Sequence, residues 1–170
     1  MQELKDKVAL ITGGSKGIGY GVAEEMLKQG MSVAITSRSQ EAADQATKTL
    51  SQWGEGRVIG LSADVRDLNA QEKVVQTIIE QFGQLDVVIA NAGVGHFASI
   101  ESLTPQQWKE TIDINLTGVF YSIKASLEAL KKSEGYLITI ASLAGTNFFA
   151  RGAAYNASKF GLVGFTQAVM

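Results

Sequence analysis

Residues 8–19 read VALITGGSKGIG, an apolar run that ends in a glycine-rich loop. The apolar part, Val8–Thr12, has the composition of a buried strand, and helix-forming residues follow the loop. In this setting Gly13 permits a tight turn, Gly17 lets the backbone approach a pyrophosphate, and Gly19 lets the helix pack closely on the sheet. The start of that helix would offer free N–H groups and a positive dipole end to phosphate. The stretch therefore predicts a dinucleotide-binding loop that opens a βαβ unit.

The residues expected to contact the cofactor in this loop are Gly13, Ser15, Lys16, Gly17, Ile18 and Gly19. A glycine-rich turn without any ligand has the same composition and remains an alternative. A Walker-type loop is excluded, because it ends in Gly-Lys-Ser/Thr, whereas Lys16 is followed by Gly17 and Ile18.

The rest of the chain alternates short apolar runs with longer helical patterns, which indicates a parallel α/β sheet with crossover helices. The further strands are expected at Ser32–Thr36, Arg57–Ser62, Leu85–Ala90 and Tyr136–Ala141. Helices are expected at Gly17–Gln29, Gln40–Trp53, Asn69–Phe82 and Pro105–Lys132, and from Ala153 onward, still running at Met170. No linker or repeat interrupts the pattern, so residues 1–170 are expected to form a single domain. The last helix is apolar and lacks a stop signal, which leads us to expect that the domain is incomplete at this end.

Composition excludes several classes of function. The 170 residues carry a net charge of -2, which gives no electrostatic reason to expect nucleic-acid or membrane-surface binding. The chain has no cysteine and one histidine, His96, so disulfides, thiolate chemistry and a histidine metal site are not expected. No apolar run approaches the roughly 20 residues that span a bilayer, and the charged N-terminus does not look like a signal peptide. We expect a cytoplasmic protein.

The end of the second strand bears on the choice of cofactor. Residues Thr36-Ser37-Arg38-Ser39 contain no carboxylate to hold a ribose 2′-hydroxyl, whereas Arg38 and Ser37, helped by Lys16, suit a 2′-phosphate. NADP(H) is therefore favoured over NAD(H), although both cations could also be ordinary surface residues. Asp64-Val65, just past the third strand, are expected beside the adenine ring, with a helix cap as the other role for Asp64.

The segment Tyr155-Asn156-Ala157-Ser158-Lys159 places a phenol and an ammonium four residues apart on one helical face. A free tyrosine, with a pKa of about 10, exchanges protons poorly at neutral pH, and a nearby cation favours the phenolate. We therefore expect Tyr155 to exchange a proton with a carbonyl oxygen, and Ser142 to hydrogen-bond the same oxygen. Alone, this spacing is equally typical of a surface pair.

Taken together, these motifs resemble the classical short-chain dehydrogenase/reductase (SDR) family. Thr12–Gly19 is similar to its cofactor loop, and Asn91-Ala92-Gly93 to the motif that steadies the sheet near adenine and ribose. The residues that match the family's catalytic tetrad are Asn115, Ser142, Tyr155 and Lys159.

The resemblance implies a Rossmann-like, doubly wound, three-layer α/β/α fold and an oxidoreductase that interconverts a carbonyl and a secondary alcohol by hydride transfer. It implies that Tyr155 is the general acid/base, that Lys159 binds the nicotinamide ribose and favours the phenolate, and that Ser142 polarises the carbonyl. It also implies that Asn115 holds a water in a proton relay; from its position alone, Asn115 could be a kink residue in a long helix. Tyr155 and Lys159 are thus expected to touch both cofactor and substrate.

Family members continue past the tyrosine helix through two further strands and a substrate-covering segment, which leaves the activity of these 170 residues open. A homodimer or homotetramer is implied through Leu127, Leu130, Phe160 and Phe165, each of which could instead belong to the core. Phe97, Phe148 and Phe149 suggest an apolar wall for a small-molecule substrate, and Arg151 a contact for an anionic one, or all four are ordinary loop residues. His96 is expected to be an exposed loop residue.

Two other interpretations are compatible with some of these residues: a non-catalytic dinucleotide-binding module or inactive fragment of such an enzyme, and a hydrolase using Ser142. The hydrolase is disfavoured because Ile140-Ala141-Ser142-Leu143-Ala144 lacks the G-x-S-x-G pattern. The identity of the substrate is not determined by the sequence.

Overall fold

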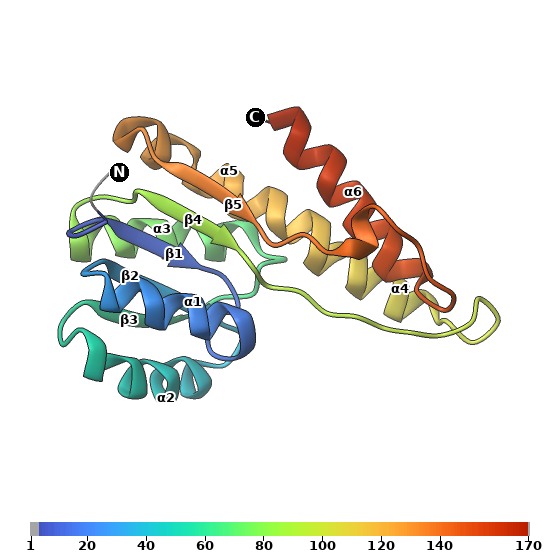
Figure 1. The fold of residues 1–170 in the computed structure, drawn as a ribbon, viewed down its shortest axis with the longest axis horizontal. Coiled ribbons are helices and arrows are strands. Elements are labelled where there is room, and N and C mark those ends of the chain that lie inside the picture. Colours follow the sequence, from blue (N-terminus) through green and yellow to red (C-terminus); the bar gives the residue numbers. More distant parts are fainter. Residues whose placement is uncertain (1–3, 170) are drawn as a thin grey trace.

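The computed structural model describes residues 4–169. At its centre lies a five-stranded parallel sheet with the order β3-β2-β1-β4-β5 (Figure 1). The strands are β1 (Val8–Ile11), β2 (Ser32–Ser37), β3 (Val58–Ser62), β4 (Val87–Ala90) and β5 (Tyr136–Thr139). The order runs outward in both directions from β1 and β4, so the predicted doubly wound sheet is confirmed, and a crevice opens where these two strands diverge.

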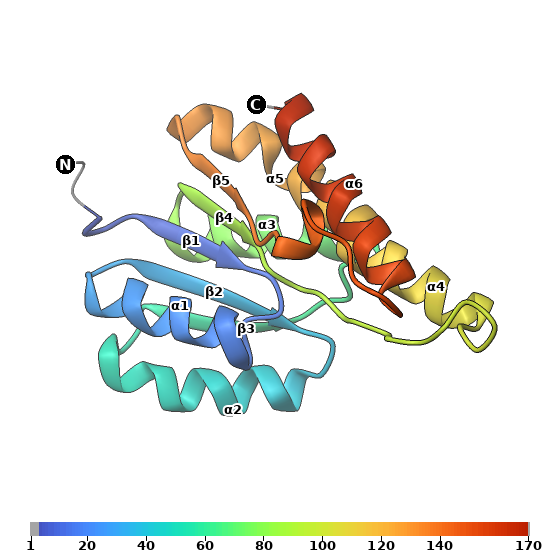
Figure 2. The same ribbon diagram turned by 45° about the vertical axis from the view of Figure 1, so that its right-hand side comes forward.

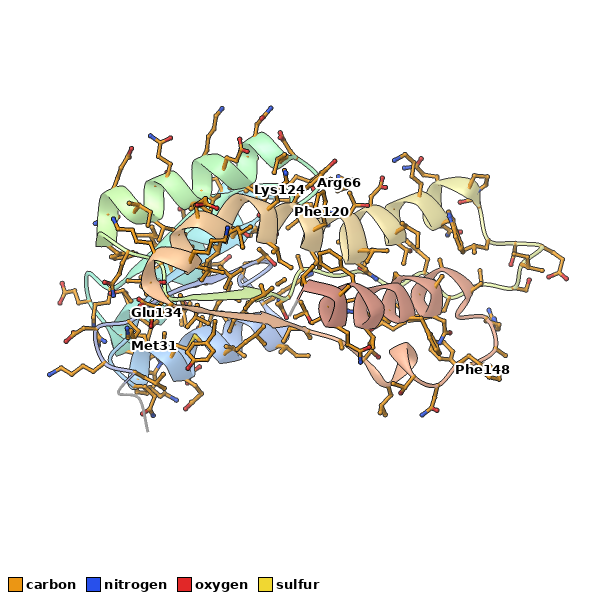
Figure 3. All side chains as sticks on the ribbon, turned by 90° about the horizontal axis from the view of Figure 1, so that it is seen from above. Met31, Arg66, Phe120, Lys124, Glu134 and Phe148 are labelled. Atoms are coloured by element: carbon orange, nitrogen blue, oxygen red, sulfur yellow. The ribbon has the colours of Figure 1, made fainter. Side chains whose placement is uncertain are left out.

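Helices cover both faces of the sheet (Figures 1 and 2). On one face, α1 (Gly17–Lys28) and α2 (Gln40–Leu50) pack against β1 and β2 through a fully apolar cluster. On the other face, α3 (Leu68–Phe82) and α5 (Gly118–Ser133) bury Val74, Ile78 and Leu130 against the sheet. Figure 3 looks along the sheet, with α3 and α5 on one side and α1 on the other. The three-layer arrangement follows from strands that are buried on both faces.

Local sequence signals explain where the helices begin. Ser39 and Asp67 accept hydrogen bonds from the backbone at the starts of α2 and α3. Thr104 and Gln107 form a reciprocal capping box at the start of α4 (Pro105–Ile112). The predicted helix to Trp53 ends instead at Leu50, and a single 3₁₀ turn follows.

The prediction of one continuous helix over Pro105–Lys132 is wrong in one respect. A π-helical turn, η2 (Asp113–Thr117), separates α4 from α5. The residues of this turn include no proline and no glycine, so the helical pattern in the sequence continues through it. The wider turn carries Asn115. Such turns occur frequently at functional sites.

The last helix, α6 (Ala153–Val169), crosses beside α4 and α5 (Figures 1 and 2). Its Leu162 is buried in a small cluster with Ala90, Val119 and Ile123. The predicted continuation of the helix to Met170 lies outside the described residues. By contrast, β5 is covered on one face only, since Tyr136 and Ile138 are 58% and 43% exposed.

Candidate active site

A cavity of about 990 Å³ lies at the carboxyl ends of the strands. Its lining comes from the loops after all five strands and from α6, which are far apart in the sequence. Nearly every residue predicted for the site lines it: Gly13, Ser15, Lys16, Gly17, Ile18, Ser37, Arg38, Asp64, Val65, Asn91, Ala92, Gly93, Ser142, Tyr155 and Lys159. Gly19 and Asn115 lie outside this lining.

The glycine loop has the backbone shape that its sequence predicts. Gly13 and Gly17 adopt positive φ angles of 64° and 61°, a region that favours glycine. A Cβ on Gly17 would meet nothing within 4 Å, so the space beside this residue is open. A Cβ on Gly19 would lie 2.5 Å from the side-chain nitrogen Nδ2 of Asn91, so a larger residue does not fit there. Lys16 is the N-cap of α1 and makes no side-chain cap. The start of α1 therefore faces the cavity with backbone groups.

Two polar side chains tie this loop to the loop after β4. Thr12 Oγ1 accepts hydrogen bonds from the backbone N–H groups of Asn91 and Ala92, at 3.0 and 3.1 Å. Asn91 Nδ2 donates to the carbonyl oxygens of Thr12 and Gly13, at 2.9 and 3.2 Å. Thr12 begins the stretch that resembles the family's cofactor loop, but its role in joining the two loops was not predicted, although a hydroxyl at the end of an apolar strand is a signal for such a contact. These bonds fix the position of the loop after β1 relative to the loop after β4, on the two sides of the crevice.

At the end of β2, Arg38 extends its side chain toward solvent with 63% exposure. Ser15 Oγ donates to Ser37 Oγ at 3.3 Å, which joins the glycine loop to this corner. Among the described lining residues the one carboxylate is that of Asp64, at the end of β3.

Asp64 is held by its own neighbour. The backbone N–H and the guanidinium of Arg66 both donate to its carboxylate, at 2.9 Å and 2.5 Å. The Arg66 side chain holds the pKa of Asp64 below its usual range. The alternative role of Asp64 as a helix cap is wrong, because Asp67 caps α3.

Tyr155 and Lys159 lie on one face of α6, as their spacing predicts. Lys159 Nζ is 5.8 Å from the centre of the Tyr155 ring and donates to the carbonyl oxygen of Ile140 at 2.7 Å. Lys159 is only 5% exposed, and this burial lowers the pKa of its ammonium. Ser142, half-buried after β5, accepts a hydrogen bond from the Ala144 N–H at 3.1 Å. A backbone carbonyl such as that of Ile140 gives no signal in the sequence.

Asn115 is fully buried behind these residues. Its Oδ1 accepts from the Val94 N–H at 2.8 Å, and its Nδ2 donates to the Val94 carbonyl at 2.8 Å and to Ser158 Oγ at 3.0 Å. The side chain thus joins η2, the loop after β4 and α6. Ser158, next to Lys159, contacts Asn115 and was not predicted as a site residue.

The two loops expected to meet substrate are in contact. The Ala98 N–H donates to the Arg151 carbonyl at 2.9 Å, and the Phe97 ring lies 5.8 Å from Phe149 and 5.6 Å from Tyr155. Phe97 lines the cavity, but Phe148 is 87% exposed at the far end of the molecule, which does not match the predicted apolar wall (Figure 3).

His96 differs from its prediction as an exposed loop residue. Its side chain is 31% exposed, and Nε2 lies 2.9 Å from Glu110 Oε2 on α4. Among residues 4–169, no group of three or more His, Cys, Asp or Glu side chains is placed to hold a metal ion. Within the same range, no helix combines the length and apolar character of a membrane span.

Comparison with known proteins agrees with this arrangement. The chain matches the family described as short chain dehydrogenase over residues 7–170. It is 35% identical over 166 residues to the D-beta-hydroxybutyrate dehydrogenase of Cupriavidus necator, covering 96% of this chain and 64% of that enzyme.

Two solved structures show the same likeness. An alcohol dehydrogenase from Thermococcus sibiricus, complexed with 5-hydroxy-NADP, matches with a TM-score of 0.90 at 32% identity, over 96% of this chain and 69% of that one. A short chain dehydrogenase/reductase from Burkholderia phymatum, in complex with NAD, matches with a TM-score of 0.94 at 27% identity, over 99% of this chain and 60% of that one. The chain therefore spans 60 to 69% of the length of the proteins named here.

Proposed function

The chain belongs to the short-chain dehydrogenase family, and from that premise we propose that it is an NADP(H)-dependent oxidoreductase that interconverts a carbonyl and a secondary alcohol. One observation carries the proposal: a single cavity is lined by the glycine loop, Arg38, Ser142, Tyr155 and Lys159. Arg38 follows β2 and Ser142 follows β5, and these strands lie on opposite sides of β1 and β4, so Arg38 and Ser142 stand at opposite ends of the crevice. This separation suits a ligand with a phosphate-bearing adenosine at one end and a reactive ring at the other.

The residues present fit a nicotinamide dinucleotide. The open space beside Gly17 and the uncapped start of α1 leave room and N–H groups for a pyrophosphate. The volume of about 990 Å³ is at the upper end of ligand pockets, which run from about 300 to 1,000 Å³.

The preference for NADP(H) rests on the corner around Arg38. Its guanidinium can bind a 2′-phosphate through two parallel hydrogen bonds, with Ser37 and Lys16 on the same rim of the cavity. The end of β2 supplies no carboxylate to this rim, since residues 36–39 are Thr, Ser, Arg and Ser. Of the two solved structures named above, one is complexed with 5-hydroxy-NADP and the other with NAD. The preference for NADP(H) is therefore argued from the residues of this chain alone.

In the proposed mechanism a bound nicotinamide supplies or accepts the hydride. The Tyr155 hydroxyl gives its proton to the carbonyl oxygen during reduction and takes it back during oxidation. The buried ammonium of Lys159, fixed by the Ile140 carbonyl, stabilises the negative charge left on the phenol oxygen. Ser142 hydrogen-bonds the same substrate oxygen and orients it. Asn115 keeps η2, the loop after β4 and α6 together, and its role in a proton relay is part of this proposal.

We expect the protein to self-associate through the outer faces of α5 and α6. Phe120, Leu127 and Phe160 are 42%, 42% and 45% exposed there. Leu130, expected at this interface, lies instead in the core between α5 and the sheet. We also propose that the protein works in the cytoplasm.

Two measurements test the proposed function. Fluorescence titration with NADPH and NADH should give a dissociation constant about tenfold or more lower for NADPH, as expected for a charge-assisted contact. Reduction of a panel of ketones should then be followed in the wild type and in Tyr155→Phe. That variant should bind NADPH as the wild type does and lose at least about 100-fold in turnover.

Tyr121→Phe, which removes a phenol hydroxyl from α5, is the matched control and should keep full activity. Substantial turnover in Tyr155→Phe would contradict the proton-transfer role, and a preference for NADH would contradict the role of Arg38. The alternative function is dinucleotide binding without catalysis. Tight binding with no turnover on any ketone would support that alternative.

A further inference from the structure

The Arg38 guanidinium has a second, competing partner on the opposite side of the crevice. Its Nη1 lies 3.9 Å from Oε1 of Glu110, a residue of α4 that does not line the cavity. The two residues are 72 positions apart in the chain and come from separate layers of the molecule. A carboxylate at this distance attracts the same cation that a 2′-phosphate would use.

The Glu110 carboxylate is held in place rather than free to turn away. Its other oxygen, Oε2, lies within hydrogen-bond distance of His96 Nε2, at 2.9 Å. The Glu110 side chain is 27% exposed, compared with 63% for Arg38. The arginine is therefore the more exposed member of the pair, and the carboxylate is the one with a further side-chain partner.

Other charged groups lie near this pair. Arg66, from the loop after β3, lies within electrostatic range of Glu110 and of Asp113, while Arg38 lies within range of Asp64. Asp113 itself is paired with Lys109 on the same helix. Asp64 and Arg66 satisfy each other through close hydrogen bonds, which leaves Glu110 as the carboxylate paired with Arg38.

We propose that Glu110 is a positioning residue that sets cofactor preference, because it draws Arg38 toward α4 and competes with the 2′-phosphate for its guanidinium. This inference rests on the proposed binding of NADP(H) at Arg38. A 2′-phosphate has to displace Glu110 from Arg38 and also meets the repulsion of the nearby carboxylate. NADH carries no such group, so its binding is indifferent to Glu110. The wild type thus binds NADPH less tightly than its arginine alone would allow.

The experiment compares four proteins: wild type, Glu110→Gln, Arg38→Met and the double variant, titrated with NADPH and with NADH at low ionic strength. Glu110→Gln keeps the size and the hydrogen bond of the side chain but removes its charge. We expect it to lower the NADPH dissociation constant about two- to fivefold, the range typical of an exposed ion pair, and to leave that of NADH unchanged. In the Arg38→Met background the same substitution should have a smaller effect on the NADPH constant, because only the direct repulsion between the carboxylate and the 2′-phosphate remains, and it should leave the NADH constant unchanged. Asp113→Asn removes one charge from the same helix end and should leave the ratio of the two constants as in the wild type.

Three results would overturn this inference while leaving the proposed function intact. These are an equal change for both cofactors, a weaker affinity of Glu110→Gln for NADPH, and an undiminished effect of Glu110→Gln in the Arg38→Met background. If no protein in the set binds either dinucleotide, the proposed function fails, and the inference fails with it. Circular dichroism of each variant checks that the fold is retained.

Discussion

Lys159 shows how a charged side chain can be positioned by the backbone around it. A buried ammonium is costly, and burial lowers the pKa of this one because its charged form is disfavoured. The Ile140 carbonyl, just after β5, offsets part of that cost through a 2.7 Å hydrogen bond. The same bond fixes the ammonium beside the Tyr155 ring, so the strand end determines the geometry of the proposed proton transfer.

The Asp64–Arg66 pair gives a prediction about pH. Because the pKa of Asp64 is lowered in the folded chain, the pair stabilises the fold above the ordinary value of about 3.8 and ceases to do so as the pH falls below it. Both side chains are about one-third exposed, so Arg66→Met should cost no more than about 1 kcal/mol at pH 7. Urea unfolding of both proteins at pH 7, 5, 4 and 3 should show this difference shrinking below about pH 4. A difference that stays constant over this range would show that the side chain contributes by packing and not by charge.

Among the elements, the π-helical turn η2 depends most on a single side chain. Asn115 makes three hydrogen bonds in a fully buried position, two of them with the backbone of Val94. No backbone ladder joins η2 to the loop after β4, so these bonds are the specific link between them. The loop in turn carries Gly95, His96 and Phe97 along the cavity or its rim.

Asn115→Ala should therefore destabilise the protein by about 3 kcal/mol, since it removes the partner of the Val94 N–H and carbonyl and the amide that donates to the buried Ser158 hydroxyl. Urea unfolding followed by circular dichroism measures this loss. Ser126→Ala is the matched control: Ser126 is equally buried on α5, but it donates only to the Ser122 carbonyl of its own helix, and the change should cost less than about 1 kcal/mol. Equal losses in both variants would mean that the turn does not rely on Asn115.

How far the sequence predicts these elements depends on the range of the contacts involved. The strands and most helix starts were predicted because local signals, such as the Thr104 cap and the apolar run before Gly13, determine them. The π-helical turn was not, because it arises from the fit of Asn115 against a loop about 20 residues earlier. Arg38 was predicted at the cofactor corner, but its partner Glu110 was not, because only the folded sheet brings α4 near β2. Residues that act through backbone atoms, such as Ile140, carry no signal in their side chains.

For the molecule as a whole, the exposed apolar side chains on the outer faces of α5 and α6 are the reason we expect self-association. Phe120 packs edge-on against Phe165 at 6.2 Å, so the two helices present one continuous aromatic surface. Exposed aromatic side chains of this kind are enriched in interfaces between subunits.

Phe120→Glu should convert the protein to a monomer, because a carboxylate cannot be buried unpaired in such an interface. Sedimentation velocity over a wide range of protein concentration measures the change. Phe148→Glu adds the same charge at a residue that is 87% exposed on the loop before α6, outside the outer faces of α5 and α6, and should leave the sedimentation coefficient as in the wild type. A wild type that is monomeric at every concentration would contradict the expectation.

The order of strands in the sheet also constrains how the chain assembles while it is made. β1 pairs with β2 on one edge and with β4 on the other. Ile11 therefore cannot pair with Ile89 until the ribosome has added the residues between them. At about 5 to 20 residues per second, a ribosome needs roughly 4 to 16 seconds to add the intervening stretch. During that interval the nascent chain exposes an unpaired apolar strand edge, and the crevice between β1 and β4 does not yet exist. No dinucleotide can therefore guide the earliest stage of folding, and its stabilising influence begins only after β4 has emerged.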